Sequence, residues 1–377
     1  MAVEFRYAQC DDYLRISQFL DEYWAKDHVY VRIPQLFTWT FGRDTLWDQE
    51  GYSFALAEDK GEIVGILGGI PFLFNCLGQT SRAMWTANYM LRPDYRRGPI
   101  ALRLLHMMRR PPYHTFIVFG ANATVIPIYG ALRAQLLSTI PRHVAVLPDA
   151  EDRMTHLLCL TRPDWSVQRA KALARAVRLT EFSHVHTASE DALPPDWNDY
   201  GWASWVTRTV GAARDLDYLT WRYLKHPCFA YRFITVPAGN RIGLAIWRLE
   251  TIRRMMPHGV EEIDRLGRLV EFLPVSRANA QDLLLHFWQA LAAVDALGAD
   301  YYGYHGEIGA WLQELGFQTV EDCVDGEAIP SRFQPLDGKG GRIMSAVFVQ
   351  GDTPACTLDR QCVWYWTKAD ADQDRPN

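Results

Sequence analysis

Short apolar runs separated by turn residues dominate the first third of the chain. Between Ser53 and Leu91 these runs alternate with the turn signals Asp59-Lys60-Gly61 and Gly78-Gln79. Apolar runs of strand length joined by glycine-containing turns are typical of an antiparallel meander. The pattern therefore predicts three successive strands.

A helix, a strand and a second helix are predicted after the meander. Helical spacing of apolar residues runs from Ile100 to Met108 and stops before Pro111-Pro112. The apolar run HTFIVFGAN follows as a strand, and a second helical spacing extends from Ile128 to Leu137.

The second half of the chain repeats the first at an offset of 182 residues. LFTWTF begins at Leu36 and YLTWRY at Tyr218, while IYGALRAQ begins at Ile128 and AWLQELGF at Ala310. Comparable strands and helices are predicted between the later matches, at 231–236, 242–250, 267–275, 280–297 and 300–304. A fixed period indicates a repeated structural unit, so we expect two copies of one α/β unit.

Polar stretches separate and follow the two copies. Residues 149–152 and the Pro- and Asp-rich segment 189–201 break the pattern, and a connecting helix is predicted between them at 164–179. From Phe333 onward we expect one or two more strands and then a charged, mobile end.

The stretch NYMLRPDYRRGPIALRLL, residues 88–105, predicts a strand, a tight basic turn and a helix that opens on the turn. Unpaired N–H groups and the helix dipole attract anions to such a helix start. Pro99 removes one of these donors, although proline is tolerated in the first turn of a helix.

Composition and charge narrow the classes of partner. The chain has 377 residues, too many for one ordinary core, so two domains are expected. The net charge of −5 argues against the broad basic surface of a DNA-binding protein. The 14 Trp, 17 Tyr and 17 Phe residues fit an aromatic core, or a cleft that stacks a flat or sugar-like ligand.

Seven scattered cysteines without a CxxC pair make a zinc site or a disulfide framework improbable, so reduced thiols are expected. The N-terminus lacks the pattern of a signal peptide, and no apolar run reaches the length of a membrane span. We therefore expect a cytoplasmic protein without a membrane partner or a metal.

Together these features resemble the GNAT superfamily of acyl-CoA-dependent N-acyltransferases, and in particular tandem-GNAT proteins of bacterial polysaccharide and modified-sugar biosynthesis. FTWTF and LTWRYLKHPCFAYRF are similar to the W-[RK]-Y segment of those proteins, and the resemblance covers roughly 1–147 and 200–320. It implies an α/β (α+β) fold of two tandem GNAT-like domains, each a mixed, mostly antiparallel sheet flanked by helices. The expected boundaries are 1–147 for an acyl-CoA-binding domain, 148–199 for a connection, and 200–377 for a domain with a degenerate cofactor turn.

The resemblance also implies a site for acetyl-CoA or another acyl-CoA. The family turn [QR]xxGx[GA], which holds the CoA diphosphate, corresponds to residues 96–101, where Arg96 and Ala101 fit and Pro99 replaces a glycine. An Asn followed seven residues later by a Tyr that protonates the departing thiolate corresponds to Asn122 and Tyr129. The implied cofactor-binding residues are Leu91, Arg92, Arg96, Arg97, Gly98, Ile100, Ala101 and Asn122, with Tyr129 as the catalytic residue.

The second copy lacks these features, since its turn has no glycine and Trp311 stands at the position of Tyr129. We expect it to wall a cleft for a small-molecule amine or amino-sugar acceptor. The general base is not evident from spacing. The candidates for contact with the acceptor are Asn88, Glu271 and His305, with Asp217 and His226 as further sources of a base.

Three functions remain open from the sequence. The first is an N-acyltransferase. The sequence leaves open whether the protein forms a homodimer. The second is a tandem relative that uses aminoacyl-tRNA, and the net acidic charge disfavours it. The third is a non-catalytic binding or scaffold protein, which Pro99 and Met107 would favour if their side chains filled the cofactor groove.

Overall fold

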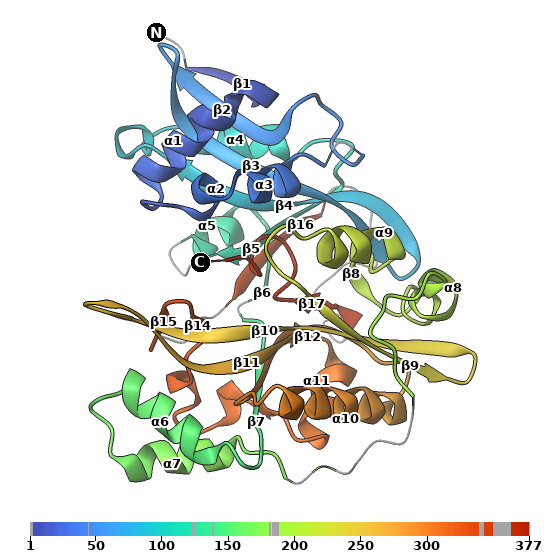
Figure 1. The fold of residues 1–377 in the computed structure, drawn as a ribbon. Helices are drawn as coiled ribbons and strands as arrows, with labels where there is room; N and C mark the ends of the chain where they lie inside the picture. The colour runs from blue at the N-terminus through green and yellow to red at the C-terminus, as the bar shows by residue number, and fades with distance from the viewer. Residues whose placement is uncertain are drawn as a thin grey trace.

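Two mixed β-sheets flanked by helices organise the chain, one above the other in Figure 1. The computed structural model describes residues 3–43, 45–121, 125–137, 139–180, 182, 188–338, 343–349 and 363–376. Within them, the first sheet has the strand order β1-β2-β3-β4-β5-β16-β6 with β8 beside β3, and the second has the order β13-β7-β12-β11-β10-β9 with β17 beside β12.

The first sheet contains the predicted meander. Its strands are β1 (Glu4–Ala8), β2 (Tyr52–Asp59), β3 (Glu62–Cys76), β4 (Gln79–Leu91), β5 (Thr115–Ala121), β6 (Gln135–Leu137), β8 (Val210–Ala212) and β16 (Met344–Val349). Lys60 and Gly61, both at positive φ, form the turn between β2 and β3. The three predicted strands are confirmed as the antiparallel set β2-β3-β4.

The second sheet repeats this order of elements. Its strands are β7 (Arg142–Val146), β9 (Arg232–Ala238), β10 (Arg241–Met256), β11 (Gly259–Leu273), β12 (Gly298–Tyr304), β13 (Gln318–Thr319) and β17 (Trp366–Thr367), and a separate hairpin joins β14 (Arg332–Phe333) to β15 (Leu336–Asp337). As in β2-β3-β4-β5, three antiparallel strands lead to a parallel neighbour, β12.

Helices cover both sheets. They are α1 (Tyr13–Tyr23), α2 (Val29–Arg32), α3 (Pro34–Phe41), α4 (Ile100–Met108), α5 (Ile126–Ala131), α6 (Glu151–Thr161), α7 (Val167–Ala176), α8 (Trp197–Tyr200), α9 (Leu216–Leu219), α10 (Arg277–Ala293) and α11 (Gly306–Glu314). Apolar residues of α1 and α3 belong to one large core cluster that extends through both sheets, whereas α4 and α5 pack in a second cluster with β2, β3 and β4.

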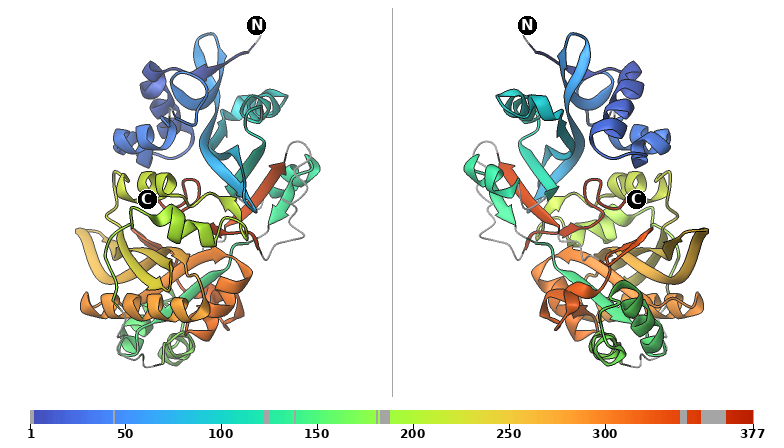
Figure 2. Two further views of the ribbon diagram at one scale, coloured as in Figure 1. Left: turned by 90° about the vertical axis from the view of Figure 1, so that its right-hand side faces the viewer. Right: turned by 90° about the vertical axis from the view of Figure 1, so that its left-hand side faces the viewer.

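Two strands cross from one half of the chain to the sheet of the other half. β7 follows the first copy in sequence but pairs with β12 and β13, whereas β16 follows the second copy but pairs with β5 and β6. Figure 2 shows the red strand β16 rising into the half that is mostly blue. The predicted domain boundaries remain a prediction, but strand pairing runs across them.

Two tryptophans 182 residues apart meet where the copies face each other. Trp39 ends the FTW segment in α3, and Trp221 lies in the π-helical turn Thr220–Leu224 after α9. Their rings stack at 4.8 Å between centroids. Each indole Nε1 donates to the other residue's carbonyl oxygen, at 3.1 and 3.3 Å. This reciprocal contact is what a repeat folded around a pseudo-twofold axis produces.

The C-terminal tail is buried, so the prediction of a charged, mobile end is wrong. Trp364 and Trp366 are at most 1% exposed, and the chain end lies between the two sheets in Figure 1. The charges of the tail have buried partners: Asp370 pairs with Arg214 and Asp374 with Arg248. These partners make burial of the carboxylates tolerable.

Three local features differ from the predictions. The helix expected over 128–137 ends at Ala131, because Arg133 turns at positive φ and Gln135 begins β6. Helix α6 lies where a polar break at 149–152 was expected, with the acidic pair Glu151 and Asp152 in its first turn. The expectation of reduced thiols is wrong for Cys76, which is disulfide-bonded.

No helix within the described ranges is both long and apolar enough to span a bilayer.

Four buried histidines predict a loss of stability in mild acid. Burial lowers the pKa of His28, His143 and His305 to about 4 and that of His226 to about 3, from an ordinary value of 6.5. The unfolded chain therefore binds more protons than the native one between these values, so the free energy of unfolding should fall as pH drops from about 6.5 to 4. Urea titrations at pH 7 and 5 measure this.

The variant His143→Gln should show a weaker pH dependence than the wild type, by up to about 1.4 kcal/mol per pH unit. A free energy of unfolding that stayed constant or rose between pH 7 and 5 would contradict the expectation.

Candidate functional site

The first sheet opens between β4 and β5. The two strands pair in parallel only from Ala83–Thr115 to Thr86–Val118, although β4 continues to Leu91 and β5 to Ala121. The carboxyl ends of parallel strands are a common place for ligands in α/β folds. Here the unpaired end of β4 leads directly into the loop before α4.

A β-bulge at this opening displaces Asn88. Asn88 and Tyr89 of β4 stand opposite the single residue Leu67 of β3, and Asn88 has a φ of 50°. Its side chain is 5% exposed, yet neither amide atom has a hydrogen-bond partner among the described residues. A buried amide left unpaired costs free energy unless a ligand satisfies it. Asn88 is therefore placed as a ligand-binding residue would be.

The loop 92–99 presents open backbone donors at the start of α4. The N–H groups of Gly98, Ala101 and Leu102 have no backbone acceptor within the described residues, and α4 has no side-chain cap. Gly98 adopts a φ of 121°, and a Cβ there would have nothing within 4 Å. Pro99 supplies the N-cap without an N–H and is itself exposed, so it does not fill a groove. The start of α4 is therefore unobstructed, and its open amide donors suit an anion such as a diphosphate.

The basic residues of the loop differ in their availability. Arg92 pairs with Asp94 at 3.0 Å, and Arg96 donates through Nε to the carbonyl oxygen of Leu91 at 3.3 Å. Arg97 is exposed and forms no ion pair with a described residue. Arg97 is therefore the cation of this turn that is most open to an anion.

Two tyrosines line the second core cluster beside the opening. Tyr129 on α5 is 6% exposed, and burial raises its pKa to about 12, so the phenol stays protonated at neutral pH. Its ring packs edge-on against Phe348, with 6.0 Å between the ring centroids. Tyr89 donates to the carbonyl oxygen of Ala101, and burial followed by the neighbouring Tyr129 phenol raises the pKa of Tyr89.

Tyr89 is not among the site residues predicted from the sequence. The sequence feature that could have identified Tyr89 is its position next to Asn88, on the strand before the turn. A β-bulge there changes the direction of both side chains. Asn122, predicted to bind the cofactor, lies outside the described residues.

The second copy has a closed counterpart of this site. A bulge in β11 leaves Val270 without a partner on β10, 182 residues after Asn88. Helix α10, however, is capped by Ser276, whose Oγ accepts from the N–H of Asn279 at 3.2 Å. The side chain of Asn279 is in turn bonded to Val236 and Val275. The start of α10 thus has a side-chain cap on one of its first amide donors, whereas α4 has none.

Glu271 is not available to an acceptor. Oε1 accepts from Arg214 at 2.8 Å and from Tyr223 at 2.7 Å, and Oε2 accepts from Tyr365 at 2.7 Å. Burial raises the pKa of Glu271, and Arg214 opposes the shift. The residue is 0% exposed, so we assign it to the interior that holds the tail and leave it out of the site.

His305 precedes α11 and packs against Trp205 and Tyr365, with ring centroids 5.4 and 6.3 Å away. No contact of His305 with the opening between β4 and β5 is found among the described residues. The structure therefore brings together Asn88, Tyr89, the 92–101 loop and Tyr129, but neither Glu271 nor His305.

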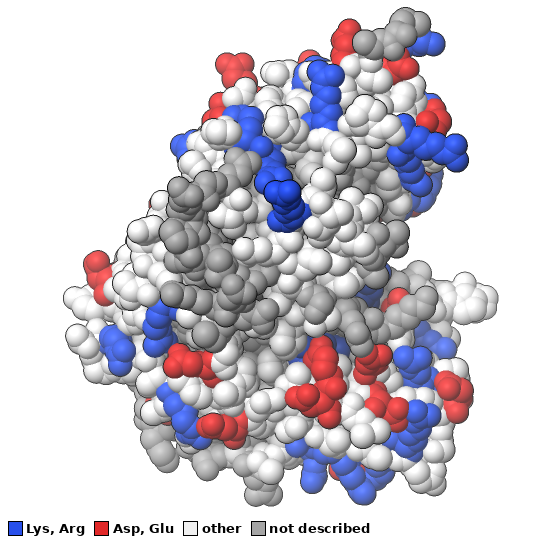
Figure 3. Space-filling model, turned by 180° about the vertical axis from the view of Figure 1, so that it is seen from behind, with Lys and Arg blue, Asp and Glu red and all other residues white. Residues whose placement is uncertain are grey.

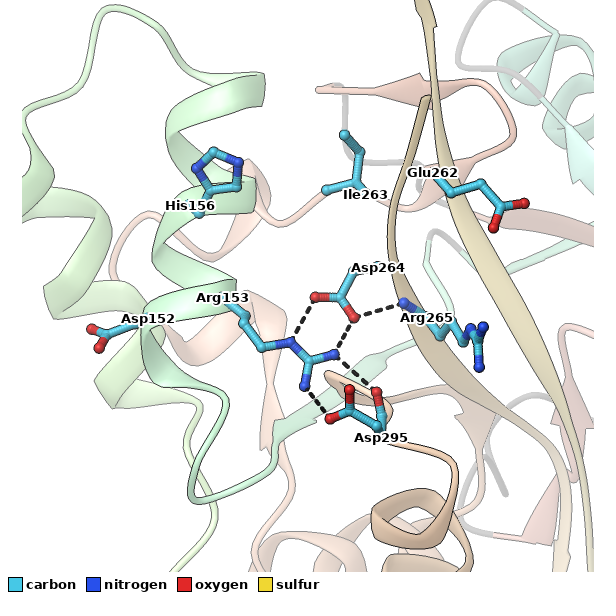
Figure 4. A pocket seen from close by; sticks show the side chains of 8 residues that line it. All are labelled: Asp152, Arg153, His156, Glu262, Ile263, Asp264, Arg265 and Asp295. Carbon is cyan, nitrogen blue, oxygen red and sulfur yellow. Dashed lines mark hydrogen bonds and ion pairs between the residues drawn. The ribbon is translucent and has the colours of Figure 1, made fainter. Parts of the chain in front are cut away.

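A separate cavity of about 660 Å³ lies between α6 and β11 and contains many charged side chains (Figure 4). Arg153 donates through Nε to Asp264 at 2.9 Å and forms an ion pair with Asp295 at 2.8 Å. These side chains satisfy one another and fasten α6 to β11. We therefore place no chemistry there.

The chain resembles known proteins in structure but matches none in sequence. No family model matches the chain, and no curated protein matches its sequence. A GCN5-related N-acetyltransferase from Anabaena variabilis aligns at TM-score 0.51 and 11% identity, over 91% of this chain and 72% of that one.

A conserved protein from Enterococcus faecalis, described as a probable N-acyltransferase, aligns at 0.53 and 9%, over 92% and 72%. Saccharomyces cerevisiae N-myristoyltransferase with bound myristoyl-CoA and inhibitors aligns at 0.54 and 10%, over 96% and 85%. At these identities the likeness is one of fold. The predicted GNAT-like fold class is confirmed.

Proposed function

We propose that this protein is an N-acyltransferase that moves an acetyl or longer acyl group from CoA to an amine. The observation that carries the proposal is the buried amide of Asn88, which lacks a partner at the opening between β4 and β5. The open N–H groups of α4 and the exposed Arg97 lie in the loop that continues from β4, and the protonated Tyr129 is close to Tyr89 of the same strand. The fold shared with acyltransferases is consistent with this assignment.

The residues divide the work of the reaction. The amides of Gly98, Ala101 and Leu102, with Arg97, would hold the diphosphate of acyl-CoA. Asn88 would bind an amide group of its pantetheine arm. The neutral amine nitrogen would attack the thioester carbonyl carbon, the C–S bond would break, and the Tyr129 hydroxyl would give its proton to the sulfur. The proton that the amine loses would pass through water to the Tyr129 oxygen and restore the phenol. The raised pKa keeps the phenol protonated at neutral pH. It can therefore donate its proton when the thiolate, whose ordinary pKa is near 8.5, develops beside it.

The acceptor in this proposal is a small or sugar-linked amine, as in polysaccharide or modified-sugar biosynthesis. The aminoacyl-tRNA alternative gains no support from the face in Figure 3, where Lys and Arg side chains are interspersed with Asp and Glu and form no single basic surface. The exposed Pro99 removes one reason to favour a non-catalytic protein.

Acetyl-CoA should bind to the wild type and bind more weakly to Arg97→Glu. The reversal places a carboxylate beside the diphosphate, so we expect a loss of about tenfold or more in affinity, measured by isothermal titration calorimetry. Arg241→Glu, an exposed charge reversal at the start of β10, is the matched control and should bind as the wild type does.

Absence of measurable binding at millimolar acetyl-CoA would refute the proposed function. Equal affinities of the two variants would remove the loop 92–101 from the site.

A further inference from the structure

A second, smaller cavity lies between the two sheets, beside the buried tail. Its volume is about 230 Å³, and its walls come from both halves of the molecule. They include Gly120 of β5, Arg248 of β10, Arg268 of β11, Tyr302 of β12, Arg332 of β14 and Lys368 of the tail. Gly120 stands one residue from the end of the strand that borders the Asn88 opening.

The carboxylates of this cavity are already paired with arginines. Arg248 binds Asp374 and Glu250, both at 2.7 Å, and Arg268 binds Glu250 at 2.9 Å. Asp372 pairs with Arg375. Each of these carboxylates therefore already has an arginine partner.

Two cations are left over. The ammonium of Lys368 lies 4.9 Å from the centroid of the Tyr302 ring and forms no ion pair or hydrogen bond with a described residue. Arg332 is exposed at the rim and forms none within the described ranges either. Because like charges in a partly enclosed space repel each other, the cavity favours a compensating anion.

We propose that this cavity binds a small molecule through a carboxylate or phosphate group held by Lys368 and Arg332. The volume of this cavity is below that of a typical cofactor pocket. The cavity therefore suits one small charged group and not a nucleotide. Since Gly120 lines the cavity and stands one residue from the end of β5, we assign the anion to the acceptor. This last assignment rests on the proposed function, whereas the anion site itself does not.

The charge of Lys368 adds a pH dependence. Burial, followed by the repulsion of Arg268, lowers the pKa of Lys368 to about 7, against the attraction of Asp300, Asp374 and Glu250. Tyr302 faces the ammonium and stays neutral, because burial raises its pKa. Anion binding should therefore weaken as pH rises through about 7.

Calorimetric titration of the full chain with inorganic phosphate and with succinate, at constant ionic strength, tests the site. We expect at least one probe to bind the wild type at millimolar concentration. Lys368→Met and Arg332→Met should each weaken it about tenfold or more, and Lys368→Arg should retain it. Lys225→Met, an exposed lysine outside the cavity, is the matched control. Preference for phosphate or succinate identifies the anionic group.

The pH dependence is measured with succinate. The affinity for succinate should decline near pH 7 in the wild type, and Lys368→Met should abolish this decline. Arg332 is exposed, so its variant keeps the test valid if Lys368→Met fails to fold. No heat with either probe, or equal affinity in the wild type and both methionine variants, would overturn the proposal. Acetyl-CoA titrated into the same variants should bind as to the wild type, so failure of the transferase function is recognised separately.

Discussion

Tyr129→Phe should lower turnover by roughly 100-fold or more, with little change in acetyl-CoA affinity. The hydroxyl is the donor that we place beside the departing sulfur. Phenylalanine keeps the ring packed against Phe348 and the rest of the second core cluster. Turnover is measured as release of free thiol from acetyl-CoA, with the most reactive amine from a panel of small amines and amino sugars.

Tyr52→Phe is the matched control, since Tyr52 is half-buried on β2, away from the opening. It should leave turnover unchanged. The pKa of about 12 keeps Tyr129 protonated up to pH 10, so this residue should cause no alkaline loss of rate below that pH. Unchanged turnover in Tyr129→Phe would exclude its role as the acid.

The second large effect is expected from Arg214→Met. Arg214 is 0% exposed and joins Glu271 at 2.8 Å to Asp370 at 2.9 Å, so it links β11 with the tail. Without the guanidinium, two buried carboxylates lose the cation that they share. Removal of one partner of a buried ion pair typically costs about 3–5 kcal/mol of the free energy of unfolding, and urea titration measures the loss.

Arg153→Met is the control for that measurement. Arg153 also pairs with two aspartates, but its side chain is 34% exposed; the side chain of Asp264 is 8% exposed and that of Asp295 is 88% exposed. The pair with Asp295 lies at the surface, where such a pair contributes about 1 kcal/mol or less, and the guanidinium reaches solvent, so the loss should be smaller than in Arg214→Met. If Arg214→Met destabilised the protein no more than Arg153→Met, the buried cluster would not be what holds the tail between the sheets.

Local patterns in the sequence were sufficient for the meander and for α4. The turn residues between β2, β3 and β4 are encoded within a few positions, and α4 has the bounds predicted from its apolar spacing. The tandem arrangement inferred from the repeat stays a prediction, and Trp39 and Trp221, which lie at the repeated positions, contact each other. In each case the deciding interactions are local or are repeated at one offset.

Long-range pairing explains most of what was missed. The tail was read as mobile because its aspartates are charged, but Arg214 and Arg248, which pair with Asp370 and Asp374, lie more than 100 residues earlier. The crossing of β7 and β16 was not predictable, since a short apolar strand does not specify its partner sheet.

The site was predicted in part for the same reason. The basic turn and Tyr129 are local motifs, but the bulge that leaves the Asn88 amide without a partner depends on the register of β3 against β4. Glu271 was proposed for the acceptor from its strand position alone. Its saturation by Arg214, Tyr223 and Tyr365 depends on three distant segments.

A crystal structure with acetyl-CoA tests the central claim most directly. We predict the diphosphate against the amides of Gly98, Ala101 and Leu102, the pantetheine arm between β4 and β5 with a hydrogen bond to Asn88, and the sulfur beside Tyr129. Acetyl-CoA bound at another surface, or a crystal saturated with it that shows no ligand at this opening, would contradict the assignment.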